Sequence, residues 1–254
     1  MKNLIYVVTH KNFNYKLIDN YIPIQVGKTN TGNQLPYISD DTGDNISEKN
    51  SNYCELTAIY WIWKNVSDYE IIGIVHYRRY FVYGSKSKLV DDYYINKYLK
   101  EYDVILPYEY VTESNVYNHF INSTSGREKD LINLRKIISE KYPNYINDYD
   151  YIMNSKSISY CNMFIMSKNN FVRYCEWLFD ILFALEKITD LSGYTKQEQR
   201  IYGFLSEFLL NVWVKHNKMK VKHCSMYYIE HNKMKNFLKK IKLGLRGCLK
   251  NKGE

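Results

Sequence analysis

The stretch EIIGIVHYRRYF, residues 70–81, joins an apolar run directly to a cluster of basic and aromatic side chains. Residues 70–77 have the length and the β-branched content of a buried strand. In open α/β sheets, ligands bind at the carboxyl ends of the strands. We therefore expect a binding site where this strand ends, at the sequence His-Tyr-Arg-Arg that begins with His76.

Strands and helices alternate along the rest of the chain. Apolar runs predict further strands, and apolar residues at helical spacing predict amphipathic helices. This alternation favours a single α/β domain, residues 1–231, with a mostly parallel central sheet. Residues 27–52 form a long polar loop, and such loops are often functional. The expected strands are residues 4–8, 103–107, 159–166 and 220–228, and the expected helices are residues 53–65, 126–141, 169–188 and 196–216.

The composition is that of a globular protein. The 254 residues are 45% hydrophobic and 16% aromatic, which provides a sizeable core and excludes collagen-like and disordered chains. The scattered cysteines form no Cys-x-x-Cys pair, and no stretch approaches the roughly 20 apolar residues of a membrane span, so we expect a reduced, cytoplasmic protein. The sequence lacks Gly-x-Gly-x-x-Gly, Walker and Gly-x-Ser-x-Gly motifs, which disfavours dinucleotide enzymes, P-loop NTPases and α/β-hydrolases.

Acidic pairs are weak candidates for a metal site. Asp148 and Asp150 form an Asp-x-Asp pattern, but they lie in an expected helix, where a solvated helix face is the commoner role. Asp40-Asp41 and Asp91-Asp92 are expected in surface turns. Because the histidines also show no metal-ligand spacing, we predict no metal site.

Two arginines follow the strand that ends near His76. A guanidinium can bind a phosphate through two parallel hydrogen bonds, so Arg78 and Arg79 suit a phosphate or diphosphate ligand. The alternative is that both arginines pair with nearby acids or extend along the surface. If the extended backbone continues, His76 and Arg78 share one face of the strand, and Tyr77 and Arg79 share the other.

Residues 53–65 and 73–81 together resemble the signature of a bacterial family known only as a domain of unknown function. Its members lie among genes for capsular polysaccharide, exopolysaccharide and O-antigen, and are treated as glycosyltransferases, some as galactofuranosyltransferases. The resemblance covers nearly all of residues 4–230. The sequence departs from the family at Gly126-Arg127, near the position where family members usually carry a histidine. If that histidine serves the acceptor site, this protein would choose a different acceptor. Further matching stretches are residues 24–27, 44–47, 162–166, 174–179 and 199–207.

The resemblance implies the A-type glycosyltransferase fold, in which the first strand and its loop hold the nucleotide. The strand ending at His76 would lie where other members of that fold carry Asp-x-Asp. Basic side chains would then replace the metal ion and stabilise the departing nucleoside diphosphate. The resemblance thus implies a UDP-linked sugar donor and no metal cofactor. The implied donor-binding residues are Thr9, His10, Gly27, Asp44, Asn45, Glu55, His76, Tyr77, Arg78, Arg79, Asn162 and Arg200.

A catalytic base is needed if the configuration of the sugar inverts, because the acceptor hydroxyl must lose a proton. The candidates are Glu198, Asp190 and Glu207. Glu207 follows Arg200 by seven residues on one expected helix, so both can face a cleft, and a structural salt bridge between them is an equal alternative. Asn162 either binds a sugar hydroxyl or satisfies the backbone.

The formal charge of +8 is concentrated at the C-terminal end. Residues 232–254 contain eight basic residues and one acid, which leaves +1 on the rest of the chain. That distribution disfavours a nucleic-acid-binding domain. Apolar residues recur among the basic ones at helical spacing, which predicts an amphipathic tail on an anionic membrane surface, with a frayed, solvated terminus as the alternative.

The resemblance, the arginines and the basic tail together imply an enzyme that transfers a sugar from a UDP-sugar to a lipid-linked oligosaccharide. Galactofuranose is the favoured sugar, and the expected place is the inner face of the cell membrane, in the synthesis of capsule, exopolysaccharide or O-antigen. UDP-galactopyranose is the alternative donor. A carbohydrate- or nucleic-acid-binding module without catalysis is the alternative from another class.

We predict that deleting residues 232–254 removes binding to anionic vesicles, because each basic residue near such a surface contributes about 1 kcal/mol. The measurement is cosedimentation with phosphatidylglycerol-containing vesicles at low and physiological salt, with phosphatidylcholine vesicles as the control. Unchanged binding after the deletion would contradict the membrane role.

Overall fold

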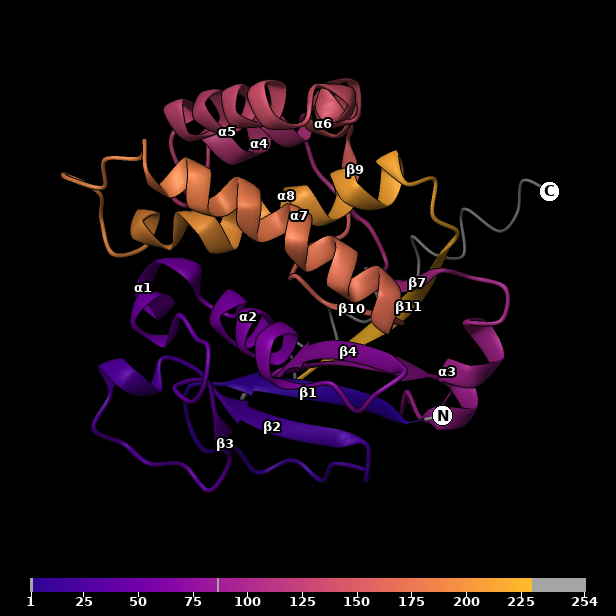
Figure 1. Ribbon diagram of the computed structural model, residues 1–254. Helices are drawn as coiled ribbons and strands as arrows, with labels where there is room; N and C mark the ends of the chain where they lie inside the picture. Colours follow the sequence, from indigo (N-terminus) through magenta and orange to yellow (C-terminus); the bar gives the residue numbers. More distant parts are fainter. Residues whose placement is uncertain (1, 86, 230–254) are drawn as a thin grey trace.

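The computed structural model describes residues 2–85 and 87–229 (Figure 1). The basic tail, residues 232–254, lies outside the described residues. Nine of the described strands form one sheet in the order β3-β2-β1-β4-β10-β7-β11-β5-β6, and β8 pairs with β9 in a second sheet. The strands are β1 (Asn3–Thr9), β2 (Tyr21–Gln25), β3 (Ile38–Ser39), β4 (Ile71–His76), β5 (Arg79–Tyr83), β6 (Lys88–Leu89), β7 (Val104–Pro107), β8 (Tyr110–Val111), β9 (Ser157–Ile158), β10 (Phe164–Ser167) and β11 (Val221–Tyr228).

The large sheet closes on itself through β4. This strand pairs with β10 on one side and with β5 through His76 and Arg79, so β4, β10, β7, β11 and β5 form a closed ring. Within the ring, only β7 and β11 run parallel to each other. Parallel pairing continues outside the ring from β4 through β1 and β2 to β3. The prediction of a mostly parallel, Rossmann-like sheet of the A-type glycosyltransferase fold is therefore wrong.

A two-residue turn is the physical reason for this difference. Tyr77 and Arg78 reverse the chain directly after β4, and such a short connection joins antiparallel neighbours, whereas parallel neighbours need a long crossover. The sequence predicted the strand before this turn but not the strand β5 after it. The sharing of one strand face by His76 and Arg78 is expected only for a continuing extended backbone, and it does not arise because β4 ends at His76.

Helices cover the sheet in two layers (Figure 1). Helices α2, α7 and α8 lie against the sheet, and α4, α5 and α6 pack beyond α7 and α8. No described helix is both long enough and apolar enough to cross a membrane. The helices are α1 (Asn50–Tyr53), α2 (Leu56–Asn65), α3 (Asp92–Tyr98), α4 (Val116–Ile121), α5 (Glu128–Lys141), α6 (Ile146–Asn154), α7 (Lys168–Glu186) and α8 (Ile201–His216).

Most of the predicted elements are confirmed, and two are interrupted by left-handed backbone. Strands β1, β4, β7 and β11 and helices α5 and α7 lie within one or two residues of their predicted bounds. The predicted helix 53–65 is divided into α1 and α2 at Cys54, which has a φ of 54°. The predicted strand 159–166 begins only at Phe164, because Cys161 and Asn162 have φ values of 85° and 47°.

The main core lies between the sheet and helices α2, α7 and α8. Helix α8 buries residues on most of its sides, which suits a helix packed between the sheet and the outer helices. Trp63 of α2 stacks on Phe179 of α7, with ring centroids 5.8 Å apart and 3° between the planes. A second core on the other face of β1 contains several tyrosines, including Tyr21, Tyr80 and Tyr94.

Asp148 and Asp150 lie on α6, as the sequence predicted. Asp148 contacts Nδ1 of His216 at 2.9 Å, and Asp150 forms a bidentate ion pair with Arg135 at 2.7 and 2.8 Å. Both carboxylates therefore serve to join helices. No group of three potential metal-ligating side chains occurs within residues 2–85 and 87–229.

Asp40 anchors the long loop of residues 27–52. Its side chain is fully buried, so the prediction of a surface turn at Asp40-Asp41 is wrong for Asp40. The buried carboxylate accepts four hydrogen bonds, and these join the loop to α2. The donors are the N–H groups of Gly27 (2.9 Å) and Lys28 (3.2 Å) and the hydroxyl groups of Ser47 (2.6 Å) and Thr57 (2.5 Å).

We predict that Asp40→Asn lowers the free energy of unfolding by at least about 2 kcal/mol, because an amide group cannot accept all four buried hydrogen bonds. Asp41→Asn is the matched control. Asp41 is half-buried, and the Ser39 hydroxyl donates to it at 2.6 Å, so we expect a change within about 0.5 kcal/mol. Urea unfolding followed by circular dichroism measures both, and equal destabilisation would contradict the anchoring role of Asp40.

Candidate functional site

Basic side chains gather at the carboxyl ends of β1 and β4, which are parallel neighbours. The ring of Tyr77, which is only 8% exposed, lies at their centre. Lys11 Nζ lies 5.5 Å and Arg78 Cζ lies 5.0 Å from the centroid of this ring. His10 packs edge-on against the same ring at 5.3 Å between centroids. Tyr77 is thus a platform that brings together basic groups from two separate loops.

The cations of this cluster are not neutralised by carboxylates. Lys11, Arg78 and Arg200 are exposed, and none of them forms an ion pair within the described ranges. Burial and then the charges of these three residues lower the pKa of His10, which places Arg200 near the same point. For Arg78, the alternative of pairing with neighbouring acids is therefore not observed. Unpaired positive charge at strand ends suits an anionic ligand such as a diphosphate.

Two carboxyl groups lie within electrostatic range of the arginines. Burial, followed by the negative charge of Glu55, raises the pKa of Glu207 on α8 to about 8, against the opposing charges of Arg79 and Arg200. The alternative salt bridge between Arg200 and Glu207 is not formed, since Arg200 Nε contacts Cys54 Sγ at 3.2 Å. A carboxyl group with a pKa near neutrality is suited to take up a proton during a reaction.

His76 ends β4 and contacts the segment that precedes β10. Its Nε2 lies 2.6 Å from the carbonyl oxygen of Cys161, and because a carbonyl only accepts hydrogen bonds, Nε2 carries the proton. Burial is the main cause that lowers the pKa of His76. The imidazole is therefore neutral near pH 7, with Nδ1 able to accept a hydrogen bond.

Asn162 connects Glu55 to α8. Its buried amide nitrogen lies 2.7 Å from Glu55 Oε1, 3.0 Å from the carbonyl oxygen of Gly203 and 2.8 Å from the hydroxyl of Ser206. Its Oδ1 has no hydrogen-bond partner among the described residues. Because Ser206 precedes Glu207, these contacts hold the two carboxyl groups of the site close together.

Left-handed backbone conformations concentrate around the same cluster. Cys54, Cys161 and Asn162 have φ values of 54°, 85° and 47°. Each such conformation in a residue other than glycine costs about 1–3 kcal/mol, and such residues are typical of functional sites. Cys54 contacts Arg200 and Cys161 contacts His76, so the strained residues hold members of the site directly.

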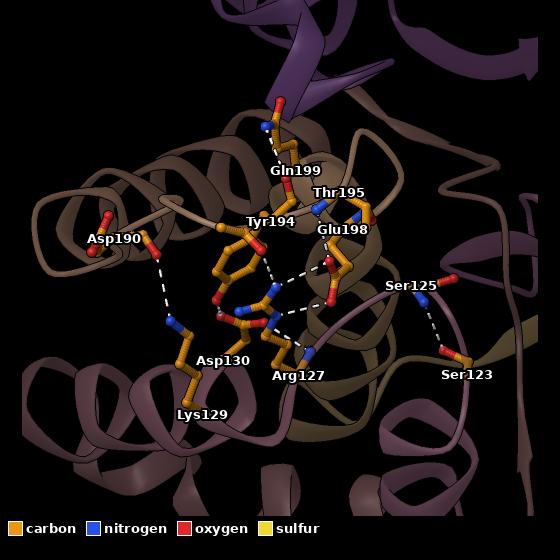
Figure 2. A network of polar contacts seen from close by, with 11 residues as sticks. Ser123, Ser125, Arg127, Lys129, Asp130, Asp190, Tyr194, Thr195, Glu198 and Gln199 are labelled. Carbon is orange, nitrogen blue, oxygen red and sulfur yellow. Dashed lines mark hydrogen bonds and ion pairs between the residues drawn. The ribbon is translucent and has the colours of Figure 1, made fainter.

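Glu198 lies in a separate polar network (Figure 2). It forms an ion pair with Arg127, at 2.9 Å to Nε and 3.2 Å to Nη2, and accepts the N–H of Thr195 at 2.8 Å. The hydrogen bond from Arg127 is the main cause that lowers the pKa of Glu198 to about 2. Asp190, which is exposed, accepts hydrogen bonds from Ser192. Because its pKa is about 2, the Glu198 carboxylate is a poor proton acceptor, and its contacts favour a positioning role.

The network in Figure 2 fastens the segment before α8 to the start of α5. Asp130 accepts the N–H of Arg127 at 3.0 Å and the hydroxyl of Tyr194 at 2.7 Å, and Arg127 Cζ lies 4.1 Å from the Tyr194 ring centroid. Because Arg200 follows this segment directly, the network positions the end of α8 that enters the site. Arg127, at the departure from the family pattern, therefore contributes to this support.

Thr9 and Gly27 lie together at the carboxyl ends of β1 and β2. The N–H of Val26 donates to the carbonyl oxygen of Thr9 at 2.9 Å. Gly27 has a φ of 64°, and a Cβ atom there would come within 2.5 Å of Asn50 Oδ1. This position requires glycine, because its backbone is left-handed and the Asn50 side chain packs directly against it.

Asp44 and Asn45 occupy the polar loop and have local partners. The hydroxyl of Tyr60 donates to Asp44 at 3.0 Å, and the N–H of Ser47 donates to Asn45 Oδ1 at 3.1 Å. No contact between either residue and the cationic cluster occurs among the described residues. The structure therefore brings Thr9, His10, Gly27 and residues 76–78 together at the ends of β1, β2 and β4, and leaves Asp44 and Asn45 apart.

Sequence reasoning missed three residues of the cluster, namely Lys11, Cys54 and Cys161. Lys11 had a usable signal, because it follows His10 in the loop after the first strand. The two cysteines carried no signal, since their role lies in left-handed backbone and contacts with Arg200 and His76 rather than in the thiol.

Comparison with known proteins identifies the family of this chain. Residues 4–218 match the model of a family described as a domain of unknown function, DUF4422. The chain belongs to the DUF4422 family. No curated protein matches the sequence.

The DUF4422 chain is also similar to a solved structure, the apo form of the bifunctional glycosyltransferase WbbM. The TM-score is 0.83 and the sequence identity is 30%, over 91% of this chain and 46% of that chain. The DUF4422 chain thus spans less than half the length of WbbM. The match to a domain of unknown function agrees with the family resemblance of residues 53–65 and 73–81. The expected similarity to a glycosyltransferase is also confirmed.

Proposed function

We propose that this DUF4422 domain is a glycosyltransferase that uses a UDP-sugar. The observation that carries the proposal is the juxtaposition, at one end of the sheet, of unpaired cations around Tyr77 and a carboxyl group, Glu207, whose pKa is raised to about 8. Sugar transfer from a nucleotide needs both features, because a diphosphate leaves while a hydroxyl is deprotonated. The similarity to WbbM supports the same class of reaction.

The cations neutralise the leaving group in this proposal. Arg78 and Arg200 bind the diphosphate oxygens, with Lys11 and His10 beside them, and the negative charge that develops as the glycosidic bond breaks is stabilised. The nucleoside then lies over the ends of β1 and β2, beside Thr9 and Gly27. Because side chains provide the positive charge, the transfer needs no metal ion.

Glu207 is the proposed base. It accepts the proton of the acceptor hydroxyl as the oxygen attacks the anomeric carbon, and the neighbouring charge of Glu55 increases its affinity for that proton. Of the other candidates from the sequence, Glu198 is paired with Arg127 in the network of Figure 2, and the Asp190 carboxylate accepts hydrogen bonds from Ser192. A single base on the face opposite the leaving group corresponds to inversion of configuration.

The finer assignment follows the family resemblance. Galactofuranose is the proposed sugar, UDP-galactofuranose the donor and a lipid-linked oligosaccharide the acceptor, in the synthesis of capsule, exopolysaccharide or O-antigen. UDP-galactopyranose is the competing donor. Release of UDP on incubation with each donor in turn distinguishes them, and absence of release with every donor tested would contradict an active transferase.

We predict that UDP binds with the same affinity in EDTA and in Mn²⁺, and that Arg78→Ala weakens this binding about tenfold or more through loss of charge-assisted hydrogen bonds. Isothermal titration calorimetry measures the affinity. Arg173→Ala is the matched control, because Arg173 is exposed on α7 and donates to Asn217 instead. Binding that is lost in EDTA and restored by Mn²⁺ would contradict metal independence, and failure of UDP to bind under both conditions would contradict the donor site.

We predict that Glu207→Gln lowers kcat/KM for transfer by about 10²–10⁴-fold while UDP binding persists. In the unmodified protein, kcat/KM rises with pH up to about 8 and is constant above it, because Glu207 must lose its proton to act as a base. Glu198→Gln is the comparison variant, and it should keep this pH dependence. A pH profile unchanged by Glu207→Gln would exclude Glu207 as the base.

Glu207 also affects stability in a way that needs no substrate. Its pKa in the folded protein, about 8, lies above the ordinary value of 4.5, so ionisation in the folded state is unfavourable. The folded protein therefore loses stability as the pH rises from about 4.5 to about 8. Glu207→Gln should remove this part of the loss, which thermal unfolding across the pH range can measure.

A further inference from the structure

Three aromatic side chains form a surface cluster beyond the donor site. Tyr110 of β8, His119 of α4 and Tyr160, which follows β9, have ring centroids 6.0, 6.3 and 6.5 Å apart in the three pairs. Tyr110 is 48% exposed, and the other two rings are partly exposed. We call Tyr110, His119 and Tyr160 the aromatic cluster.

The polar atoms of the aromatic cluster are available to a ligand. Within residues 2–85 and 87–229, neither the hydroxyl groups of Tyr110 and Tyr160 nor the ring nitrogens of His119 have a protein hydrogen-bond partner. The buried Tyr21, by contrast, donates its hydroxyl to the carbonyl oxygen of Val90 at 2.9 Å. Flat apolar faces combined with free polar edges suit a ligand that is apolar on its faces and hydroxylated at its rim.

The aromatic cluster lies beside the proposed base. Asn211 of α8 contacts three backbone atoms, at 3.1 Å and 2.8 Å to the N–H and carbonyl groups of Ser159 and at 2.7 Å to the carbonyl oxygen of Glu207. Tyr160 follows Ser159 directly, and burial and then the charge of Glu207 raise its pKa. Tyr160 is also joined to the donor site, because the next residue, Cys161, accepts the hydrogen bond of His76.

The backbone holds the aromatic cluster in place before any ligand binds. Tyr110 pairs with Ile158 in the short antiparallel sheet of β8 and β9, and Thr112 N–H donates to the carbonyl oxygen of Lys156 at 2.9 Å. Tyr160 lies two residues after Ile158, the last residue of β9. A rigid aromatic surface binds a ligand with little loss of side-chain entropy.

The charge around the aromatic cluster distinguishes its ligand from the donor diphosphate. Glu109 and Glu113 flank β8, both are exposed, and neither forms an ion pair with a described cation. The exposed cations of the proposed donor site lie elsewhere, around Tyr77 at the ends of β1 and β4. A phosphate or uronate would be repelled at β8, whereas an uncharged sugar ring would not.

We propose that the aromatic cluster is the acceptor subsite, which binds an uncharged sugar unit of the acceptor glycan and presents its hydroxyl to Glu207. One ring face of the sugar stacks on Tyr110, the most exposed ring, and its hydroxyl groups bond to the Tyr160 hydroxyl and to His119, since the Tyr160 plane is turned 62° from that of Tyr110. This assignment rests on the proposed transferase function. It gives the acceptor and the donor diphosphate separate positions on the two sides of Glu207.

The test uses saturation-transfer NMR on the full chain with a panel of uncharged methyl glycosides, namely the galactoside, glucoside, mannoside and rhamnoside. We expect saturation transfer to at least one of them, and saturating UDP should not compete with it. Tyr110→Ala should weaken binding about fivefold through loss of a stacking face. Tyr160→Phe keeps the ring and should weaken binding less than Tyr110→Ala does.

Tyr93→Ala is the matched control, because Tyr93 is 70% exposed on α3, outside the aromatic cluster. The proposal is overturned if no glycoside of the panel receives saturation, if UDP displaces the glycoside, or if Tyr93→Ala weakens binding as much as Tyr110→Ala. Calorimetric titration of UDP into the same samples measures the affinity of the donor site separately. Glycoside binding without UDP binding would contradict the transferase proposal while leaving the sugar site intact.

Discussion

The reversal of the chain at Tyr77 and Arg78 is the constraint on which the rest of the structure depends. It ends β4 at His76, starts β5 at Arg79 and closes five strands into a ring. The same two residues place a buried aromatic ring and an exposed guanidinium at the end of the sheet. One short turn thereby determines both the topology of the sheet and the position of the cationic cluster.

Opposite charges are kept apart in this site. Arg78, Lys11 and His10 surround Tyr77 without carboxylate partners in the described chain, whereas Glu207 lies on α8 and Glu55 accepts a hydrogen bond from Asn162. A direct ion pair would neutralise the arginines and lower the pKa of the carboxyl groups. In the proposed transferase, this separation leaves the cations free for a diphosphate and keeps the pKa of Glu207 high, so that the ionised carboxylate is a strong base.

Much of the surrounding structure supports α8. The network of Arg127, Asp130, Tyr194 and Glu198 fastens the segment before the helix (Figure 2). Asn211 fastens the middle of the helix to the backbone of Ser159, which precedes Tyr160. Hydrogen-bonded groups of this kind fix side-chain positions more narrowly than apolar packing alone. This explains why Glu198, an attractive base in the sequence, has a structural partner instead.

The sequence by itself determined the strands at 71–76 and 104–107, the long helices, the family and the residues around His76, because apolar periodicity and a long motif are local properties. It did not determine the direction of the strands, since a turn of two residues at Tyr77 decides it, nor the burial of Asp40. Only the tertiary structure distinguished Glu207 from Glu198 as the candidate base, because the pKa of a carboxyl group depends on burial and on charges that are distant along the chain. The same holds for Tyr110, His119 and Tyr160, which meet only after β8 pairs with β9.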